Sequence, residues 1–524
     1  MRKIHFLPAL FIFHFATAQN DYDASISTKI KQEVAQNSKV MDLAFYLTDV
    51  NGPRLTASQG YMNAANWASN TFKSWGLTNV KLEPWGDFGK GWEQQRTYIA
   101  MTKPYYQPLI AVPRAWTGST PGNGVITSEV VLIKATDSAG LMQYAGKLKN
   151  KIVMTMVMDS LRPSFTPDAR RWEDTTLDRM AQAVPRETGP RPQQQGTPQR
   201  PNAFATNQSF QRTLTKLLND EKPALILSFN RSGNDGTIFV SGGGQYTKDA
   251  PEGPANLMLS SDDYLRLQRL VSAGIKTELE AEVKTKFNSS DIKGYNVIAE
   301  IEGSDPKLKN EIVMLGGHLD SWHGATGATD NAAGCAVMME AARLLKTMNL
   351  KPKRTVRIVL WSGEEQGLFG SRNYVKNHLA DPVNMKLLPE HSKVSAYYNL
   401  DNGGGKIRGI YAQGNTSVVP IFSKWLEPFK ELGAQTVTIN NTGSTDHVSF
   451  DAVGVPGFQF IQDPLEYNTR THHTNMDTYD HLVPADLKQA SAVVAAFVYN
   501  TAQSTDKLPR KELPQPRGET PRGF

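Results

Sequence analysis

The sequence predicts an α/β protein, in which a mostly parallel, mixed sheet is flanked by helices and carries an inserted β-rich domain. From residue 295 onward, apolar runs typical of buried strands alternate with helical segments, which indicates a largely parallel sheet. Between residues 113 and 240, short β-branched runs are separated by Gly and Pro, a pattern typical of a smaller β-rich module. The length of 524 residues, 39% of them hydrophobic, also favours more than one domain.

Residues 1–18 are predicted to be a secretory signal peptide. Arg2 and Lys3 precede an apolar run over residues 6–15, and Ala16-Thr17-Ala18 provides a cleavage site. The run is shorter than the roughly 20 residues of a membrane span. We therefore expect an exported protein, periplasmic or extracellular, without a membrane span; the alternative is a buried N-terminal helix.

Residues 19–112 are assigned to the N-terminal part of the main domain. A helix is expected between residues 54 and 77, with Ser58 as its N-cap and Gly76 at its end. The inserted domain is assigned to residues 113–284, with GVITSEVVLI, KIVMTMV, ALILSF and TIFVSG as strands and a helix from Ser261 to Gly274. Within it, residues 162–202 are rich in Pro, Gln and Arg, which predicts a long, poorly ordered excursion.

The main domain continues over residues 285–505. Its predicted strands are NVIAEIE, EIVMLGG, TVRIVLWSG, SAYYNLD, GIYAQG and GFQFIQ. Helices are expected over residues 331–348, 420–432 and 485–501. Residues 506–524, rich in Pro and Arg, are expected to be a disordered tail.

Charge and cysteine content exclude several classes of protein. Of the net charge of +6, the leader contributes +2 and the tail after residue 506 contributes +3, which leaves +1 for the rest. A basic face for nucleic acid is therefore not expected. A single cysteine excludes a disulfide scaffold and a cysteine-rich metal site. Any metal must be bound through His, Asp and Glu.

Residues of metal-ligand type follow four predicted strands of the main domain, and one more precedes a helix. In open α/β sheets, ligands bind beyond the carboxyl ends of the strands, so these groups are predicted to share one site. Each motif alone has an ordinary explanation; Asp330, for example, could be a helix N-cap. The positions are His318, Asp320, Asp330, Glu364, Glu365, Asp401, His472 and His473.

This set suits two divalent ions. Zinc accepts neutral imidazole and carboxylate oxygen, and a carboxylate between two ions can bind both. Asp320, two residues after His318, is placed to accept the other imidazole N–H. Of the adjacent Glu364 and Glu365, one can bind metal while the other serves as general base. Cys335 is expected in the core.

The strings GGHLDSW, GATDNAAG, WSGEEQGLFGS, YYNLDNGGG, STDHVSF and THHTNMDTYD resemble those of the co-catalytic di-zinc exopeptidases, the family of leucyl aminopeptidase, glutamate carboxypeptidase and the transferrin receptor. The His-His-Thr pattern and GPRLTAS most resemble the plasma glutamate carboxypeptidase (carboxypeptidase Q) branch. The resemblance implies a phosphorylase/hydrolase-like zinc peptidase fold and identifies the insert as similar to a protease-associated domain.

The resemblance also implies roles for the site residues. One zinc ion would be held by His318 and Asp401, the other by Glu365 and His473, with Asp330 bridging both. Glu364 matches the general base and Asp320 the carboxylate behind the first histidine. His472 occupies a position where some relatives carry a tyrosine that supports the oxyanion. Asp446 and His447 fall in a loop that helps line the substrate site in relatives.

The resemblance implies a secreted exopeptidase that hydrolyses peptide bonds near the N-terminus of short peptides, using a metal-bridging water. Carboxypeptidase action, a non-catalytic binding protein with an inert metal site, and amide chemistry on non-peptide substrates remain alternatives. The sequence lacks H-E-x-x-H and G-x-S-x-G, which excludes thermolysin-like and typical serine hydrolases. The oligomeric state, a dimer included, stays open.

Overall fold

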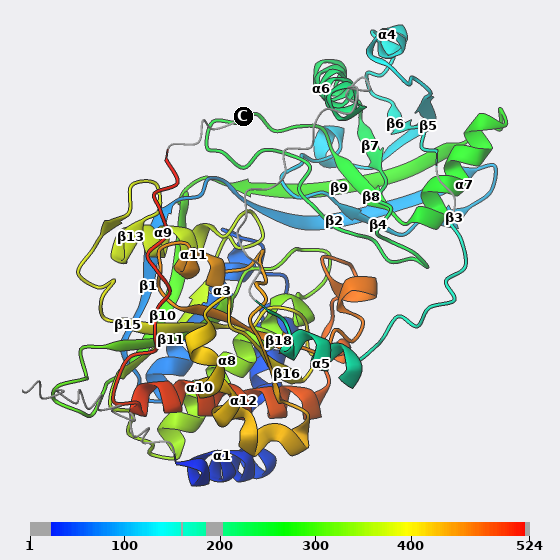
Figure 1. The fold of residues 1–524 in the computed structure, drawn as a ribbon. Coiled ribbons are helices and arrows are strands. Elements are labelled where there is room, and N and C mark those ends of the chain that lie inside the picture. The colour runs from blue at the N-terminus through cyan, green and yellow to red at the C-terminus, as the bar shows by residue number, and fades with distance from the viewer. Residues whose placement is uncertain (1–22, 159–160, 185–202, 519–524) are drawn as a thin grey trace, which may run out of the picture.

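The protein contains two eight-stranded sheets, one in the main domain and one in the insert (Figure 1). The structure, a computed structural model, describes residues 23–158, 161–184 and 203–518. The predicted signal peptide therefore lies outside the described residues. Within them, no helix has both the length and the apolar character needed to cross a membrane.

The main sheet is mixed, with a parallel centre. Strands β12, β11, β15 and β18 are parallel neighbours, as are β16 and β17, whereas the other three pairs are antiparallel. The predicted mostly parallel sheet is confirmed. Its strand order is β1 (Thr78–Asp87), β10 (Lys293–Ile301), β12 (Thr355–Trp361), β11 (Ile312–His318), β15 (Val394–Asn399), β18 (Gly457–Gln462), β16 (Ile407–Tyr411) and β17 (Thr436–Thr438).

Helices cover both faces of this sheet, because its central strands are apolar on both sides. In β11, Val313 and Leu315 pack into one hydrophobic cluster, while Ile312 and Met314 pack into another. The first face carries α1 (Ala24–Asn37), α2 (Val40–Phe45), α3 (Gln59–Ser74), α8 (Ala333–Thr347), α10 (Val419–Leu426) and α12 (Pro484–Gln503). The second carries α9 (Phe369–His378) and α11 (His447–Asp451), and a two-stranded sheet of β13 (Ala380–Asp381) and β14 (Lys386–Leu387) follows α9.

The predicted helix signals are present. The Ser58 side chain accepts a hydrogen bond from the Tyr61 N–H at 3.1 Å, so it caps α3 as expected. Gly76, with a φ of +72°, ends the same helix in the left-handed conformation that glycine adopts without strain. Helix α7 (Ser261–Ser272) begins at Ser261, as predicted, and the Ser260 side chain caps it.

The insert is built on a sheet of its own, packed by α4 (Ser138–Leu141), α6 (Ala203–Glu221) and α7. This sheet includes β2, which starts at Gly91, before the predicted boundary at residue 113, and pairs with β9 along nearly its whole length. The predicted strand TIFVSG forms only isolated bridges. The strand order is β3 (Gln107–Pro108), β2 (Gly91–Lys103), β9 (Glu278–Asn288), β5 (Ile126–Ile133), β6 (Ile152–Thr155), β7 (Leu225–Ser228), β8 (Asn256–Leu259) and β4 (Ala111–Pro113).

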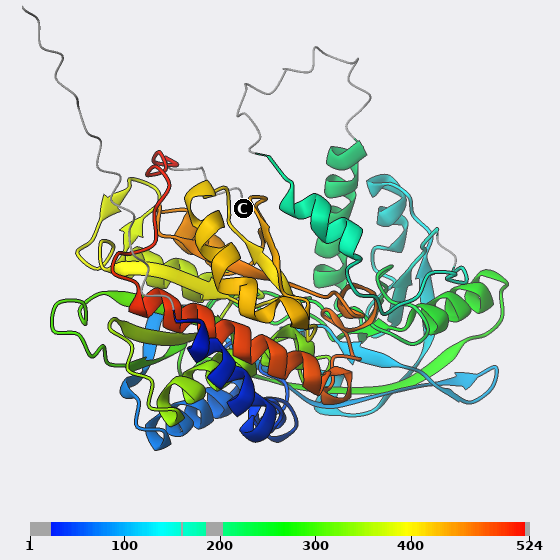
Figure 2. The same ribbon diagram turned by 60° about the horizontal axis from the view of Figure 1, so that its bottom comes forward.

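The two sheets are joined by a continuous two-stranded ribbon. The chain runs from β1 into β2 through three residues and returns from β9 into β10 through four. Because β1 pairs with β10 and β2 pairs with β9, both connections lie side by side. Figure 2 shows the insert extending sideways from the main domain on this ribbon.

Parts of two segments expected to be poorly ordered make specific contacts where the structure describes them. Within residues 162–202, α5 (Asp174–Ala181) lies against β17 of the main domain. In the tail, the Arg510 guanidinium donates to the carbonyls of His391 and Val394, both at 2.7 Å, and Leu508 is buried. Specific anchoring groups thus override a composition typical of disorder. Residues 185–202 and 519–524 lie outside the described residues.

Candidate metal centre

The structure brings the predicted ligands to the edge of the main sheet at which its parallel strands end. His318 is the last residue of β11, Asp401 lies two residues after β15, and Glu364 lies three residues after β12. His473 follows the turn Tyr467–Thr471 beyond β18. Since β12, β11, β15 and β18 are parallel neighbours, their carboxyl ends bring these side chains into one cluster.

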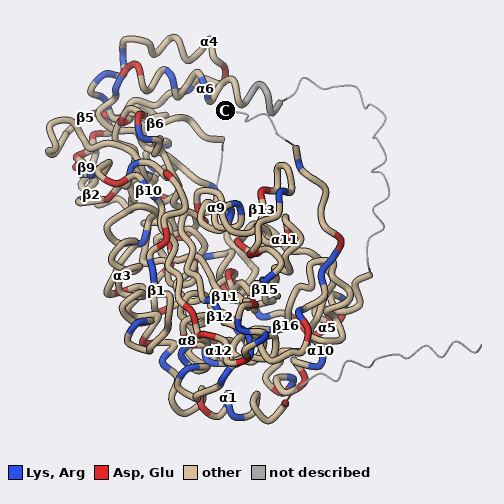
Figure 3. The backbone as a smooth tube through the Cα atoms, turned by 90° about the vertical axis from the view of Figure 1, so that its left-hand side faces the viewer, with Lys and Arg blue, Asp and Glu red and all other residues tan. Residues whose placement is uncertain are grey.

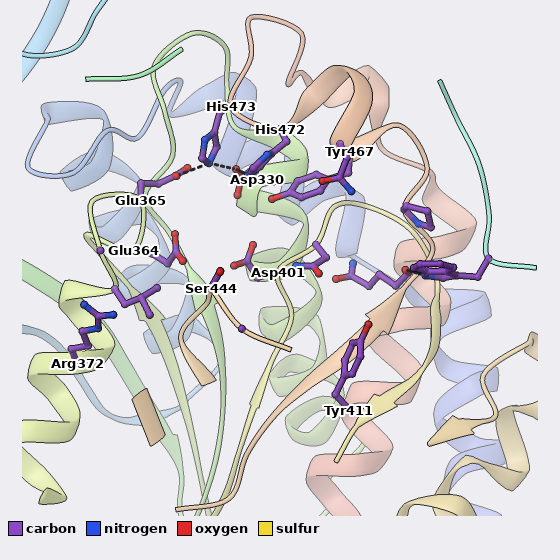
Figure 4. A pocket seen from close by; sticks show the side chains of 18 residues that line it. Asp330, Glu364, Glu365, Arg372, Asp401, Tyr411, Ser444, Tyr467, His472 and His473 are labelled. Atoms are coloured by element: carbon purple, nitrogen blue, oxygen red, sulfur yellow. Dashed lines mark hydrogen bonds and ion pairs between the residues drawn. The ribbon is translucent and has the colours of Figure 1, made fainter. Parts of the chain in front are cut away.

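Asp330 lies at the centre of the cluster. Its Oδ1 lies 3.3 Å from His318 Nε2, and its Oδ2 lies 3.2 Å from His473 Nε2. The carboxylate thus presents one oxygen to each imidazole, and Figure 4 shows the side that faces His473. Asp330 is not a helix N-cap, because α8 begins at Ala333 and its cap residue, Ala332, makes no side-chain hydrogen bond.

Each imidazole also faces a second carboxylate. His318 Nε2 lies 3.2 Å from Asp401 Oδ1, and His473 Nε2 lies 2.8 Å from Glu365 Oε2. The cluster therefore has two halves that share Asp330, with one histidine and one further carboxylate in each half. This is the grouping that the resemblance implied.

Glu364 belongs to neither half. Its Oε2 lies 3.9 Å from His318 Nε2, and it lines the pocket beside Asp401. Burial raises the pKa of its carboxyl well above the usual range, and the negative charge of Asp401 raises it further. A carboxylate with a raised pKa next to candidate metal ligands has the chemistry expected of a general base.

Asp320 contacts His318 through its backbone carbonyl and not, as predicted, through its side chain. The His318 Nδ1 atom lies 2.9 Å from the Asp320 backbone carbonyl oxygen, whereas the nearest carboxylate oxygen is 3.8 Å away. The carboxylate instead accepts hydrogen bonds from the backbone N–H groups of Glu364 and Glu365, both at 3.3 Å, and from the Thr56 hydroxyl at 2.9 Å. Asp320 thus holds the Glu364–Glu365 turn with its side chain and the His318 ring with its main chain.

Of the three residues predicted to contact the substrate or the oxyanion, only His472 lines the pocket among the described residues. His472 lines the pocket, 3.8 Å from Asp330 Oδ2, and packs against the Tyr467 ring with 4.7 Å between centroids. Asp446 is fully buried and is not among the described residues that line the pocket. Burial raises the pKa of Asp446 to about 7. His447 is also buried, and its Nε2 lies 3.2 Å from the Thr442 carbonyl oxygen.

Asp477 is a supporting residue to which the sequence analysis gave no role. Its carboxylate accepts hydrogen bonds from the backbone N–H groups of Thr329, at 2.6 Å, and Asp330, at 3.1 Å. It therefore fixes the backbone that carries the central carboxylate. Its place four residues after His473, within THHTNMDTYD, was the available signal.

Arg54 organises the loop that joins His318 to Asp330. Its fully buried guanidinium donates to four backbone carbonyls, those of Leu319, Leu47, Thr326 and Gly327, at 2.6 to 2.9 Å. These contacts tie the N-terminal segment to the loop. GPRLTAS, which includes Arg54, therefore has a structural role next to the metal centre.

We expect Arg54→Met to destabilise the protein strongly. Each buried carbonyl left without a donor costs about 1–3 kcal/mol, so the free energy of unfolding should fall by at least that amount. Lys39→Met, which removes an exposed ion pair with Asp42, should change it by less than about 1 kcal/mol. Urea unfolding followed by circular dichroism measures both, and equal midpoints would contradict the role of Arg54.

The insert touches the metal centre directly. The Val240 N–H donates to the His473 carbonyl at 2.7 Å, and the Phe239 ring lies 5.5 Å from the His473 ring. His323 is buried between the domains, with Nε2 2.6 Å from the Pro113 carbonyl oxygen, so it has a structural role. Cys335 is a buried core residue, as expected.

The ligands open into a pocket of about 610 Å³. Its walls come from the main domain and, at one side, from residue 172 of the insert. The labelled Tyr411 and Tyr467 lie on one side of Asp401, and Glu364 and Arg372 lie on the other (Figure 4). The pocket is lined by Trp172, Asp330, Glu364, Glu365, Gly367, Leu368, Arg372, Asp401, Asn402, Tyr411, Gly443, Ser444, Gln462, Pro464, Tyr467, Asn468, His472 and His473.

The cluster fits a pair of divalent cations. Asp330 Oδ2 and Glu365 Oε1 are buried without a hydrogen-bond donor among the described residues. Burial, and the charge of Asp330, raise the pKa of Glu365 to about 7. Four carboxylates and two imidazoles line one pocket with a single Arg and no Lys among its described lining residues. Bound cations would offset this excess of negative charge.

Comparisons with known proteins agree with the fold and with the predicted enzyme class. Residues 296–498 match the model of peptidase family M28. Mouse carboxypeptidase Q is 26% identical over 97% of this chain and 100% of its own length. A crystal structure of a peptidase M28 precursor from Shewanella amazonensis has a TM-score of 0.65 at 24% identity, covering 94% of this chain and 98% of the other. A zinc aminopeptidase from Bacillus subtilis has a TM-score of 0.54 at 18% identity, covering 90% and 98%.

The fold, the paired carboxylate–imidazole cluster and these matches define a metallo-exopeptidase of the co-catalytic zinc class. Residues 296–498 match peptidase family M28, and the chain is similar to carboxypeptidase Q along nearly its whole length. Its predicted family and enzyme class are thereby confirmed.

Proposed function

We propose that this protein is an exported zinc exopeptidase that removes residues from the N-terminus of short peptides, or splits dipeptides. The observation that supports this most is the position of Asp330, with one oxygen toward His318 and the other toward His473. The proposal of export depends on the leader, and that of a protease-associated insert on the resemblance of its sequence.

Two zinc ions are proposed, one held by His318 and Asp401 and the other by Glu365 and His473, with Asp330 shared. When bound, they would supply Lewis acidity that lowers the pKa of a water molecule and polarises the scissile carbonyl. Zinc is the metal named for the Bacillus relative, and His with carboxylate ligands suits it.

The side chains of this protein have separate tasks in the proposed reaction. Glu364 accepts the proton of the attacking water and then donates it to the leaving amine. Asp320 keeps Glu364 in place through its backbone N–H. His472 and Tyr467 line the pocket with N–H and O–H groups, which makes them the candidate donors to the oxyanion of the tetrahedral intermediate.

A carboxypeptidase mode is favoured by one observation. Arg372 is exposed and lines the pocket, on the same side of Asp401 as Glu364. Its guanidinium could bind the carboxylate of a substrate C-terminus. A dipeptide can be a substrate for an aminopeptidase and for a carboxypeptidase, because both of its termini lie one residue from the scissile bond.

Metal removal tests the proposed chemistry. We expect a chelator to abolish hydrolysis of Leu-Leu and two equivalents of zinc per chain to restore it, as measured by elemental analysis beside a ninhydrin assay. Full hydrolysis by metal-free protein would contradict the proposal.

Blocked dipeptides separate the two directions. An aminopeptidase should hydrolyse Leu-Leu amide and spare N-acetyl-Leu-Leu, because acetylation removes the α-amine. A carboxypeptidase should show the reverse preference. Chromatography of the products gives the direction, and cleavage of neither dipeptide in zinc-loaded protein would exclude both modes.

A further inference from the structure

A segment of the insert is built into the surface of the main domain beside the pocket. We name residues 168–181 the strap. The Arg170 N–H donates to the Leu465 carbonyl at 3.0 Å, and the Thr469 hydroxyl donates to the Asp168 carbonyl at 2.8 Å. Figure 1 shows α5, the helical part of the strap, among the elements of the main domain, away from the sheet of the insert.

The strap is held by charged groups around the buried carboxylate of Asp463. Asp463, which is fully buried, accepts hydrogen bonds from the Trp172 N–H at 2.9 Å and from Arg171 Nη1 at 2.8 Å. Arg408 donates to the same carboxylate and to the Trp172 carbonyl, both at 3.0 Å. The Asp463 carboxylate therefore holds the strap through the backbone N–H of Trp172 and the side chain of Arg171.

Two further contacts extend this attachment. Arg171 also reaches Asp486 Oδ2 at 2.7 Å. Leu177, in α5, is buried, and α5 lies against β17. The strap is thus anchored on both sides of Trp172, which leaves that side chain little freedom to move.

Trp172 is the residue by which the insert lines the catalytic pocket. Its indole N–H donates to the Gln462 carbonyl at 2.8 Å, which fixes the orientation of the ring. Tyr411, Pro464 and Tyr467 line the pocket with it. The strap, β16 and residues 462–468 form this wall of the pocket. Among the described residues that line it, these segments contribute no charged side chain. These walls suit an apolar side chain, because aromatic rings bury a large apolar area in a fixed geometry.

We propose that the strap is a specificity-determining element, in which Trp172, with Tyr411 and Tyr467, binds a bulky apolar side chain of the substrate. This inference rests on the proposed peptidase function. The insert would then select the substrate, since the strap and not the peptidase sheet supplies the indole. An apolar substrate residue such as Leu or Phe is bound, whereas Ala leaves the subsite partly empty.

Substrate selectivity of zinc-loaded full-length protein tests the inference. The ratio of kcat/KM for Leu-Leu over Ala-Ala should fall about 10–200-fold in Trp172→Ala, the range in which apolar pockets discriminate side chains. Trp172→Phe should keep most of the ratio. Arg171→Ala, which loosens the strap without removing a pocket residue, should lower the ratio in the same direction. Trp67→Ala removes a half-buried tryptophan that stacks on Tyr46 outside the pocket and should leave the ratio unchanged.

Binding measurements separate this inference from the proposed function. Calorimetry of Leu-Leu and Ala-Ala with Glu364→Gln protein, with and without Trp172→Ala, reports the subsite without hydrolysis. A preferential loss of Leu-Leu affinity supports the strap even if the wild type cleaves no peptide, an outcome that would remove only the peptidase proposal. Unchanged ratios in both Trp172→Ala and Arg171→Ala, in kinetics or in binding, overturn the role of the strap.

Discussion

Glu364→Gln is expected to lose 10²–10⁴-fold in kcat while the protein keeps two zinc ions, because the loss of a general base has about this effect. Glu364 lines the pocket but lies 3.9 Å from His318 and has no contact with His473 among the described residues. The amide has nearly the same shape but cannot accept the proton of the attacking water. Steady-state kinetics and elemental analysis of the same preparation measure both parts.

Glu365→Gln is the matched control, since the two residues are adjacent and both are turned toward the cluster. Glu365 lies 2.8 Å from His473 Nε2, so its substitution should lower zinc content as well as activity. Near-wild-type activity in zinc-loaded Glu364→Gln would refute the base assignment. Loss of zinc from Glu364→Gln, with retention in Glu365→Gln, would show that the two roles are exchanged.

Asp330→Asn should have the largest effect of all. The central carboxylate faces both histidines, and a neutral amide offers only one oxygen to two cations. We expect both zinc sites to weaken together and activity to fall by more than the 10²–10⁴-fold attributed to the base. Zinc titration with a competing chelator, beside kinetics, measures this coupling.

Asp477→Asn should lower zinc affinity less than Asp330→Asn does. Asp477 binds the backbone N–H of Asp330 and not the ligand side chains, so a loss of about 10–100-fold in zinc affinity is expected. Circular dichroism should show both variants folded. Two zinc ions bound at wild-type affinity by Asp330→Asn would contradict the bridging role.

The main sheet and the clustering of the candidate ligands could be predicted because their signals are local. Each ligand follows an apolar strand or precedes a helix, and parallel strands place such positions at one edge by geometry alone. Asp330 was the ambiguous member, since an Asp before a helix is usually a cap. Only the structure shows that its backbone, at φ −129°, is not helical and that its carboxylate faces the pocket.

The supporting contacts could not be predicted because they join distant parts of the chain. Arg54 contacts a loop 265 to 273 residues later, and Trp172 contacts a strand end 290 residues later. The Pro and Arg content of residues 162–202 gives no signal of a buried partner such as Asp463, which binds residues 171 and 172. The side-chain contact of Asp320 also depends on the turn at Glu364, whose backbone N–H groups compete for it.

The continuous ribbon that joins the two sheets has a consequence for the ancestry of such enzymes. Because the chain leaves and re-enters the peptidase sheet on paired strands, one short hairpin between β1 and β10 could replace the whole insert. Gain or loss of the module by recombination would then keep the strand order of the catalytic half, although the strap contacts with Asp463 would be gained or lost with it. Lineages could exchange this accessory module, and with it their substrate preference, while conserving the chemistry.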